Sequence, residues 1–455
     1  MSGKVFISDD ILQNTAKSIQ DVLGVETQYA PQDFPDAIKT IPESWYGVEV
    51  YTTVSNPAIR RIGAPVLHRN LPIQSGMRRC LLLDDGTVNY YLDPNDSTLK
   101  EDGETAAVLD GTDGQVMVEI PEHYRKIEIE GNKQRVKLSQ YPLNGFTRIP
   151  AMYISAFEAA LDRTNSKLAS VVNTTTQYRG GNNTSGWDGT YRSLLGKPAT
   201  SISLTSFRTY ARNRGTNWAC HDVNVYTEMW MLYLVEYANR NCQLAFNSSL
   251  DANGYHKGGL GDGVTTTIAS AWSSYNSYNP FIPCGTTLSL GNNTGVVSYS
   301  VPNETEGSTW NTFSVPSYRG VENPFGHIWK WTDGILVNIA ASGTSDVYIC
   351  TDNTKFSSSL TNDYTKVGEE ARTSNYTQNV IWPYPIANQV SGSSTTGYCD
   401  YHYTSIPSSG SSLRGVYWGG GASVGADAGF AYAYSNNEPS NTIARIGSRL
   451  CFTRS

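Results

Sequence analysis

The residue types that carry catalysis or bind metals are spread along the chain without a recognisable spacing. The histidines are His68, His123, His221, His256, His327 and His402. None stands in an HExxH segment or a close pair, so the spacing predicts no zinc site. The acidic stretch from Asp93 to Asp113 has Thr98 where an EF-hand loop requires glycine, which favours solvated turns. The local sequence predicts no metal and no cofactor, and leaves open only ligands drawn from distant positions.

Two further patterns could indicate a hydrolase. Residues Gly421–Gly425 match the GxSxG nucleophile motif, but that motif needs a later histidine, and none follows His402. Asp427 and Glu438 are the only carboxylates after Asp400, and they are the pair that a glycan-cleaving enzyme would use here. The first pattern is a chance match in a glycine-rich segment, and the second is kept as an alternative.

Composition excludes other classes of protein. Lys and Arg total 34 against 41 Asp and Glu, a net charge of −7, and no basic cluster is present. Nucleic-acid binding needs clustered cations, so we expect none. No stretch reaches the length of about 18 apolar residues that a membrane span requires, and the start MSGKVFISDD has no signal-peptide core. The seven scattered cysteines are expected to be free, buried thiols made in a reducing compartment.

Changes of pattern divide the chain into three regions. Residues 1–45 form a helical segment and residues 46–114 a β-rich connecting domain. Residues 115–455 form one large α+β domain, in which the region 245–320, rich in Gly, Ser, Asn and Thr, is expected to be surface loops.

The first region carries the signals of a helix start and stop. Ser8 is a plausible N-cap before the acidic pair Asp9–Asp10, and apolar residues recur at helical spacing over Ile11–Leu23. Gly24 is a natural end for this helix, and a second short helix is expected to begin near Pro35.

Two segments of the large domain have clear periodicity. Residues 223–239 are apolar nearly all round, which predicts a buried helix. Its two acids, Glu228 and Glu236, are expected to bond backbone or arginine groups in the core. Val136 and Leu138 alternate with basic residues, which is typical of a half-buried strand.

Aromatic residues give the strongest pattern near the C-terminus. Trp329 and Trp331 alternate, so they share one face of an extended segment, and we interpret them as a core pair. Phe430, Tyr432 and Tyr434 alternate with two alanines, which on a strand places three aromatics on one face. We expect that face to be an amphipathic contact surface, with the alanines packed inward. An ordinary core strand with the opposite orientation is the alternative.

These residues carry a resemblance to a known family. The C-terminal half resembles the C-type-lectin-like fold of formylglycine-generating-enzyme relatives, on the segments Gly326–Trp331, Arg414–Trp418 and Gly447–Leu450. It is most similar to phage tail-fibre receptor-binding proteins, including variable proteins diversified by retroelements. The segments DGQVMVEIPEHYRK, LNGFTRIPAMYISAFE and ISDDILQNTAKSIQDVLG also resemble those tail proteins.

The resemblance implies an α+β, C-type-lectin-like fold without enzyme chemistry. The cysteine pair of the oxidising relatives and the HxxxHxE set of the iron-dependent relatives are absent, and the segment Glu438–Ser440 departs from the Glu-Pro-Asn triplet of calcium-dependent lectins. The implied protein is a homotrimer in the phage tail, made in the host cytoplasm. Residues 1–45 would attach it to other tail proteins, and the C-terminal domain would bind a glycan or protein receptor on the host cell.

The resemblance also assigns roles to residues of the terminal element. Those allowed as receptor contacts are Tyr417, Phe430, Tyr432, Tyr434, Asn436, Thr442, Ala444 and Arg445. Those expected to be structural core are Trp329, Trp331, Trp418 and Arg449. The alternatives are a glycan-cleaving enzyme of the virion and a purely structural tail protein.

Overall fold

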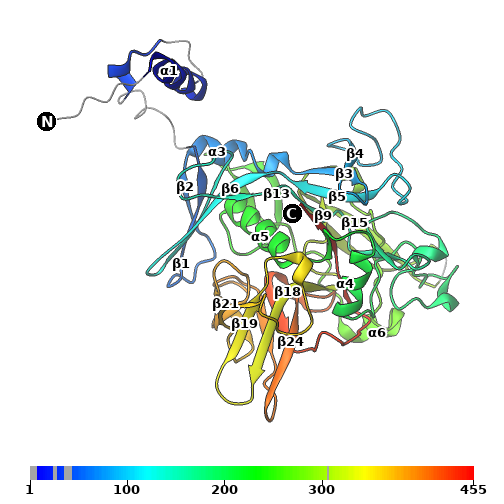
Figure 1. The fold of residues 1–455 in the computed structure, drawn as a ribbon. Helices are drawn as coiled ribbons and strands as arrows, with labels where there is room; N and C mark the ends of the chain where they lie inside the picture. The colour runs from blue at the N-terminus through cyan, green and yellow to red at the C-terminus, as the bar shows by residue number, and fades with distance from the viewer. Residues whose placement is uncertain (1–7, 24–27, 35–43, 305–306, 455) are drawn as a thin grey trace.

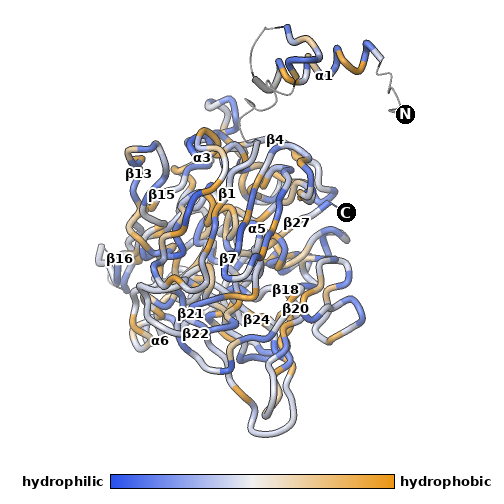
Figure 2. The backbone as a smooth tube through the Cα atoms, turned by 90° about the vertical axis from the view of Figure 1, so that its left-hand side faces the viewer, coloured by the Kyte–Doolittle hydropathy of each residue, from blue (hydrophilic) through white to orange (hydrophobic). Residues whose placement is uncertain are grey.

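The computed structural model describes residues 8–23, 28–34, 44–304 and 307–454. Near its start, helix α1 (Asp9–Leu23) confirms the predicted helix, and the Ser8 carbonyl accepts the amides of Ile11 and Leu12 at 3.1 and 3.2 Å. Hydrophobic and hydrophilic residues alternate along α1 (Figure 2), and Ile19 packs near Phe34. The stop at Gly24 and the second helix from Pro35 lie outside the described residues.

Two antiparallel sheets form the upper part of the molecule in Figure 1. The five-stranded sheet has the order β2 (Arg60–Gly63), β1 (Tyr46–Tyr51), β7 (Lys133–Ser139), β6 (His123–Glu130), β8 (Thr147–Ile149). The six-stranded sheet has the order β12 (Trp218–Cys220), β27 (Leu450–Thr453), β9 (Met152–Ser155), β5 (Gln115–Ile120), β3 (Arg78–Leu82), β4 (Val88–Tyr91). Val136 and Leu138 of β7 are buried, as their alternation predicts.

These sheets cross the boundary that the sequence pattern placed at residue 115. Strand β1 pairs with β7, and β3 pairs with β5. Leu81 of β3 and Val118 of β5 belong to the same buried cluster. Regions 46–114 and 115–455 therefore share their sheets and their core, because β1 and β3 of the first region each satisfy part of their backbone hydrogen bonds with a strand of the second.

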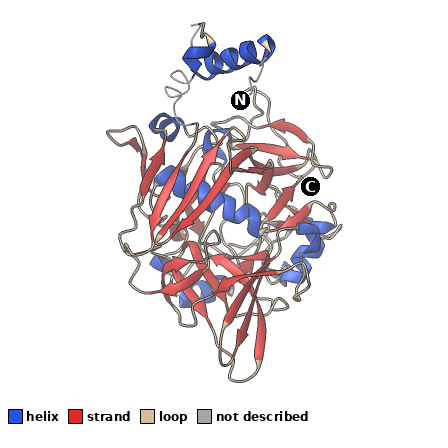
Figure 3. Ribbon diagram, turned by 60° about the vertical axis from the view of Figure 1, so that its left-hand side comes forward, coloured by secondary structure: helices blue, strands red, loops and turns tan. Residues whose placement is uncertain are grey.

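Helix α5 (Val223–Tyr237) is the centre of the core and confirms the predicted buried helix. Every residue except Asn224 is buried, and the helix contacts β1, β9 and β18 (Trp329–Ala340). Figure 3 shows it packed behind the strands. Its two acids have the partners expected of them: Glu228 pairs with Arg125, and Glu236 pairs with Arg319.

The region 245–320 contains regular structure, which corrects the expectation of surface loops. Its elements are β13 (Phe246–Leu250), β14 (His256–Gly258), α6 (Ala269–Asn276), β15 (Gly295–Pro302) and β16 (Thr309–Tyr318). Trp272, Phe281 and Phe313 from this region belong to a separate buried cluster, which Ile328 and Ala422 complete. The polar composition hides these elements because their few aromatic residues are widely spaced and meet only in the folded chain.

The lower part of the molecule in Figure 1 is a nine-stranded sheet. Its path is β20 (Thr365–Glu369), β19 (Ser345–Ile349), β18, β24 (Ser411–Gly419), β25 (Gly429–Ser435), β23 (Tyr401–Thr404), β21 (Asn375–Val380), β22 (Ala387–Val390), with β26 (Ile446–Gly447) beside β18. Most pairs are antiparallel, but β23 runs parallel to β25. The chain is thus of the α+β class, with more strand than helix.

All seven cysteines are buried free thiols, as predicted from their scatter. Burial raises the pKa of Cys220 and Cys242 well above the ordinary thiol value. In the described part of the chain, no helix has the length and apolarity needed to cross a membrane.

Candidate binding surface

One face of the nine-stranded sheet carries a continuous row of aromatic rings. Tyr403, Tyr434, Tyr417 and Trp331 are directly paired from strand to strand across β23, β25, β24 and β18. The first three stack in sequence: the ring centroids of Tyr403 and Tyr434 are 4.3 Å apart, and those of Tyr434 and Tyr417 are 4.7 Å apart. Direct cross-strand aromatic pairs of this kind stabilise a sheet and fix ring orientation.

A second group of rings lies beside this row on the same face. Trp329 contacts Tyr432 edge-on at 4.7 Å, Tyr432 contacts Tyr401 at 5.9 Å, and Tyr401 contacts Tyr376 at 5.3 Å. We call these eight residues the aromatic face: Trp329, Trp331, Tyr376, Tyr401, Tyr403, Tyr417, Tyr432 and Tyr434. The rings support one another, so each is held in place before any ligand arrives.

Burial is graded across the aromatic face. Trp331 and Trp329 on β18 are buried, and Tyr417 and Tyr432 are only 3% and 4% exposed. Tyr434 and the three tyrosines of β23 and β21 are half-buried. The β18 end therefore belongs to the core, whereas the tyrosines at the β23 and β21 end are partly exposed to solvent.

The expected grouping of Phe430 with Tyr432 and Tyr434 is wrong. Phe430 is 1% exposed, and its ring lies 5.2 Å from that of Tyr233 on α5. The pairing of β24 with β25 shifts at the start of the strand, where Gly419 opposes Gly429. Because this irregularity interrupts the alternation, Phe430 points to the α5 core.

The prediction that Tyr417 and Tyr432 are exposed receptor contacts is also wrong, because both side chains are buried. Both belong to a buried cluster with Leu204 and Phe207 of helix α4 (Leu204–Arg212). Neighbouring strands and helix α4 leave the two side chains almost no solvent access.

The other expected contact residues lie nearer the surface. Asn436, Ala444 and Arg445 are half-buried, and Thr442 is exposed. The Arg445 guanidinium lies over the ring of Tyr278 at 5.6 Å, which is a cation–π contact of ordinary length.

The sequence interpretation missed three members of the aromatic face. Tyr376, Tyr401 and Tyr403 come from strands that precede the C-terminal element. The alternation of Tyr401 and Tyr403 around His402 was an available signal, because it has the period of a strand. Their meeting with Tyr432 and Tyr434 depends on the parallel pairing of β23 and β25, which no local pattern shows.

Polar groups at the edge of the aromatic face orient its hydroxyls. The Tyr376 hydroxyl donates to the Asp427 carboxylate at 2.6 Å, and the Asn437 amide donates to the Tyr417 hydroxyl at 2.9 Å. Burial, together with the bond to Asp427, raises the pKa of Tyr376 to about 12. Burial raises the pKa of Tyr434 and Tyr401 also. These three phenols are neutral at pH 7 and can both donate and accept hydrogen bonds.

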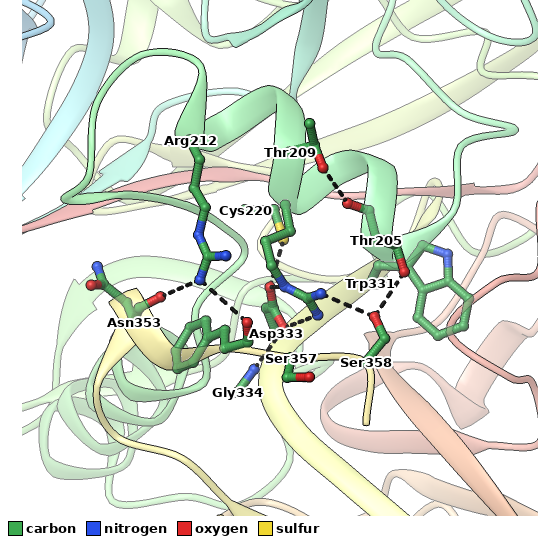
Figure 4. Close-up of polar contacts among 12 residues, drawn as sticks. Thr205, Thr209, Arg212, Cys220, Trp331, Asp333, Gly334, Asn353, Ser357 and Ser358 are labelled. Atoms are coloured by element: carbon green, nitrogen blue, oxygen red, sulfur yellow. Dashed lines mark hydrogen bonds and ion pairs between the residues drawn. The ribbon is translucent and has the colours of Figure 1, made fainter. Parts of the chain in front are cut away.

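A buried ion pair fixes the strand that carries the two tryptophans. Arg208 of α4 donates to both carboxylate oxygens of Asp333 on β18, at 2.7 and 2.8 Å. Arg208 also donates to Ser358 at 3.0 Å, and Ser358 shares a hydrogen bond with Thr205. Figure 4 shows Asp333, Ser358 and Thr205 in this network with Trp331 alongside. The helix and the strand are thereby held together where the aromatic row begins.

A second buried network anchors the start of β18. The Lys330 ammonium lies 2.8 Å from one oxygen of Glu158, and His327 Nδ1 lies 2.6 Å from the other. Burial alone would raise the pKa of Glu158, but Lys330 and His327 lower it to about 2. The remaining expected core residues, Trp418 and Arg449, are fully buried.

The two carboxylates considered for glycan cleavage have separate partners. Asp427 accepts the Tyr376 hydroxyl, whereas Glu438 is 3.8 Å from Arg414. Among the described residues, no group of three or more His, Cys, Asp or Glu side chains is arranged to hold a metal ion.

Comparison with known proteins gives low similarities only. No family model and no curated protein matches the chain. The structure of PvdO from Pseudomonas aeruginosa is similar over 76% of this chain and 98% of its own, at 10% identity and a TM-score of 0.31. The U1 and M1 variants of Major Tropism Determinant are each similar over 83% of this chain and 71% of theirs, at 14% identity and a TM-score of 0.27.

Proposed function

We propose that this chain is a receptor-binding protein of a phage tail, and that the half-exposed end of the aromatic face contacts the host-cell receptor. The observation that carries the proposal is the row of paired and stacked rings that runs from the core at Trp331 to half-buried tyrosines at Tyr434 and Tyr403. Two of the three segments that resemble the C-type-lectin-like fold, Gly326–Trp331 and Arg414–Trp418, lead into or lie in the same strands, β18 and β24.

The chemistry of the exposed end suits recognition of a polar surface. Each tyrosine offers a flat apolar ring and a neutral hydroxyl, which can lie against a sugar or a peptide and hydrogen-bond to it. Because the rings are already stacked on one another, little side-chain freedom is lost when a ligand binds. The proposed contacts are Tyr376, Tyr401, Tyr403 and Tyr434, with Asn436, Thr442, Ala444 and Arg445 at the rim.

The rest of the proposal follows from the resemblance. The C-terminal region would have a C-type-lectin-like fold, and residues 1–45 would attach the protein to the tail and hold three copies together. Three copies on one particle would raise the apparent affinity of a weak individual contact through effective concentration. The protein would act in the virion as a non-enzymatic adhesin.

The test is binding of the purified full chain to intact host-range cells. We expect the double variant Tyr401→Ala/Tyr403→Ala to bind at least about 30-fold more weakly, since two central aromatic contacts are each worth roughly 1–2 kcal/mol at an interface. The matched control is Tyr141→Ala, which removes a tyrosine that is 56% exposed on another part of the surface. Its binding should equal that of the wild type.

Thermal unfolding of each variant separates contact from stability. The proposal predicts lost binding by a double variant that still unfolds cooperatively, with only a modest fall in melting temperature from the lost cross-strand ring contacts. Unchanged binding by a folded double variant would refute the role of the aromatic face. Release of reducing ends from host polysaccharide by the wild type would contradict the non-enzymatic part of the proposal.

A further inference from the structure

A polar pocket of about 600 Å³ lies in elements distinct from the aromatic face. It forms where the hairpin of β10 (Ala160–Asp162) and β11 (Lys167–Ala169) meets the segment 176–183. Its lining residues are Arg163, Thr164, Thr176, Gln177, Arg179 and Asn183. Every one of these side chains ends in a hydrogen-bonding group, and two carry a positive charge. None of the lining residues is an acid.

Arg163 is the residue that sets the character of the pocket. Its backbone amide donates to the Gln177 carbonyl at 3.1 Å, and its Nε donates to the Arg179 carbonyl at 2.7 Å, so the side chain is fixed. Its Nη2 is buried without a hydrogen-bond partner. Within the described chain, Arg163 forms no ion pair. Burial, and then the nearby Arg179, lowers its pKa to about 10, so it remains charged at pH 7.

The second arginine has its charge compensated. The Nε of Arg179 lies 2.9 and 3.0 Å from the two carboxylate oxygens of Asp188, and its Nη1 donates to the Asn183 side chain at 3.1 Å. Asp188 therefore balances one of the two guanidinium groups and leaves the other unbalanced. The buried Nη2 of Arg163 has no acceptor, which is unfavourable, and an anion placed beside it removes that penalty.

We propose that this pocket binds an oxyanion substituent, a carboxylate or a phosphate, carried by a carbohydrate. The planar guanidinium of Arg163 matches the paired oxygens of such a group. The hydroxyls of Thr164 and Thr176 and the amide of Asn183 surround it and can bond sugar hydroxyls. The volume exceeds what a lone ion requires and lies in the range of small-molecule sites. This inference does not depend on the role of the aromatic face.

The experiment is calorimetric titration of the full chain with three related sugars. Glucose 6-phosphate carries the phosphate, glucuronate carries the carboxylate, and glucose carries neither. We expect at least one charged sugar to bind with a Kd on the order of 1 mM, glucose to show no binding, and added NaCl to weaken the interaction. The tighter of the two charged sugars identifies which oxyanion the pocket prefers.

Two variants assign the binding to the pocket. Arg163→Gln should weaken binding of the charged sugar by about tenfold or more, because it removes a charged hydrogen-bond donor. The affinity of Arg163→Lys should lie between those of Arg163→Gln and the wild type, because lysine keeps the positive charge but lacks the paired donors of the guanidinium. The control Arg148→Gln changes an arginine that is 61% exposed and paired with Glu122 outside the pocket, and it should bind as the wild type does.

Two results for the wild type and Arg163→Gln would overturn the proposal, and one result for the control would count against it. One is the absence of binding by either charged sugar at millimolar concentration in the wild type, which needs no variant to fold. The other is equal binding by the wild type and a folded Arg163→Gln, which would place the anion elsewhere. Loss of binding by Arg148→Gln to the same extent would show a general charge effect and would likewise count against the pocket.

Discussion

Removal of Arg208 should destabilise the protein more than loss of any surface ion pair. Arg208 and Asp333 are 7% and 1% exposed, and their contact is bidentate. In Arg208→Leu the carboxylate of Asp333 stays buried, with the Gly334 amide at 3.0 Å as its main remaining donor. Breaking a buried pair in this way costs about 3–5 kcal/mol.

The expected change in melting temperature follows from the size of the chain. With an unfolding entropy of about 2.1 cal/mol/K per residue, 455 residues give a fall in Tm of about 3–5 °C for Arg208→Leu. Scanning calorimetry measures it. The control is Arg148→Leu, which breaks the exposed pair with Glu122 and should cost less than about 1 kcal/mol.

A double variant tests the reasoning directly. In Arg208→Leu/Asp333→Leu neither charge of this pair remains. Much of the lost stability should therefore return, because apolar replacements of buried ion pairs are often nearly neutral. A fall in Tm for Arg208→Leu no larger than that of Arg148→Leu would refute the argument. So would a double variant whose loss equals the sum of the two single losses, since coupled groups in contact are not additive.

Three further predictions test other parts of the structure. Burial raises the pKa of Glu370 to about 8. Its contribution to the free energy of unfolding is therefore fully present below about pH 4 and is lost as the pH rises through 8. Glu370→Gln should flatten the fall of Tm with pH over this range, and an unchanged dependence of Tm on pH would show that Glu370 does not titrate there. Gly47→Ala should prevent stable folding, because a Cβ at that position would lie 2.0 Å from the Val136 carbonyl oxygen of the neighbouring strand; soluble protein with wild-type Tm would contradict the β1–β7 pairing. The seven buried cysteines should react slowly with a thiol reagent in the native protein and all react in denaturant, whereas rapid native labelling would refute their burial.

Elements with a strong local pattern could be predicted from the sequence. The segment at 223–239 is apolar on all sides, and only the interior of a protein accommodates such a helix. The alternation of Val136 and Leu138 fixed which face of β7 is buried. The scatter of the cysteines indicated free thiols. For the helix and the strand, the neighbours that set the pattern are a few residues away along the chain, so the periodicity of the sequence is enough to predict which side chains are buried.

Elements whose partners are distant in the sequence could not be predicted. The regions before and after residue 115 differ in composition but share two sheets, because strand pairing is set by hydrogen bonds that composition does not record. The aromatic residues of 245–320 meet in a cluster only after long stretches of polar chain are folded around them.

The aromatic face contains both kinds of feature, those that a local pattern predicts and those that depend on distant segments. The sequence by itself determined that aromatic residues alternate near the C-terminus and that Tyr432 and Tyr434 share a face. The tertiary structure decided that Phe430 leaves this face at an irregular pairing, that α4 and its neighbours bury Tyr417 and Tyr432, and that β23 brings Tyr401 and Tyr403 alongside. The physical reason is that a side chain's direction follows from the local backbone, whereas its exposure depends on which strands and helices pack beside it.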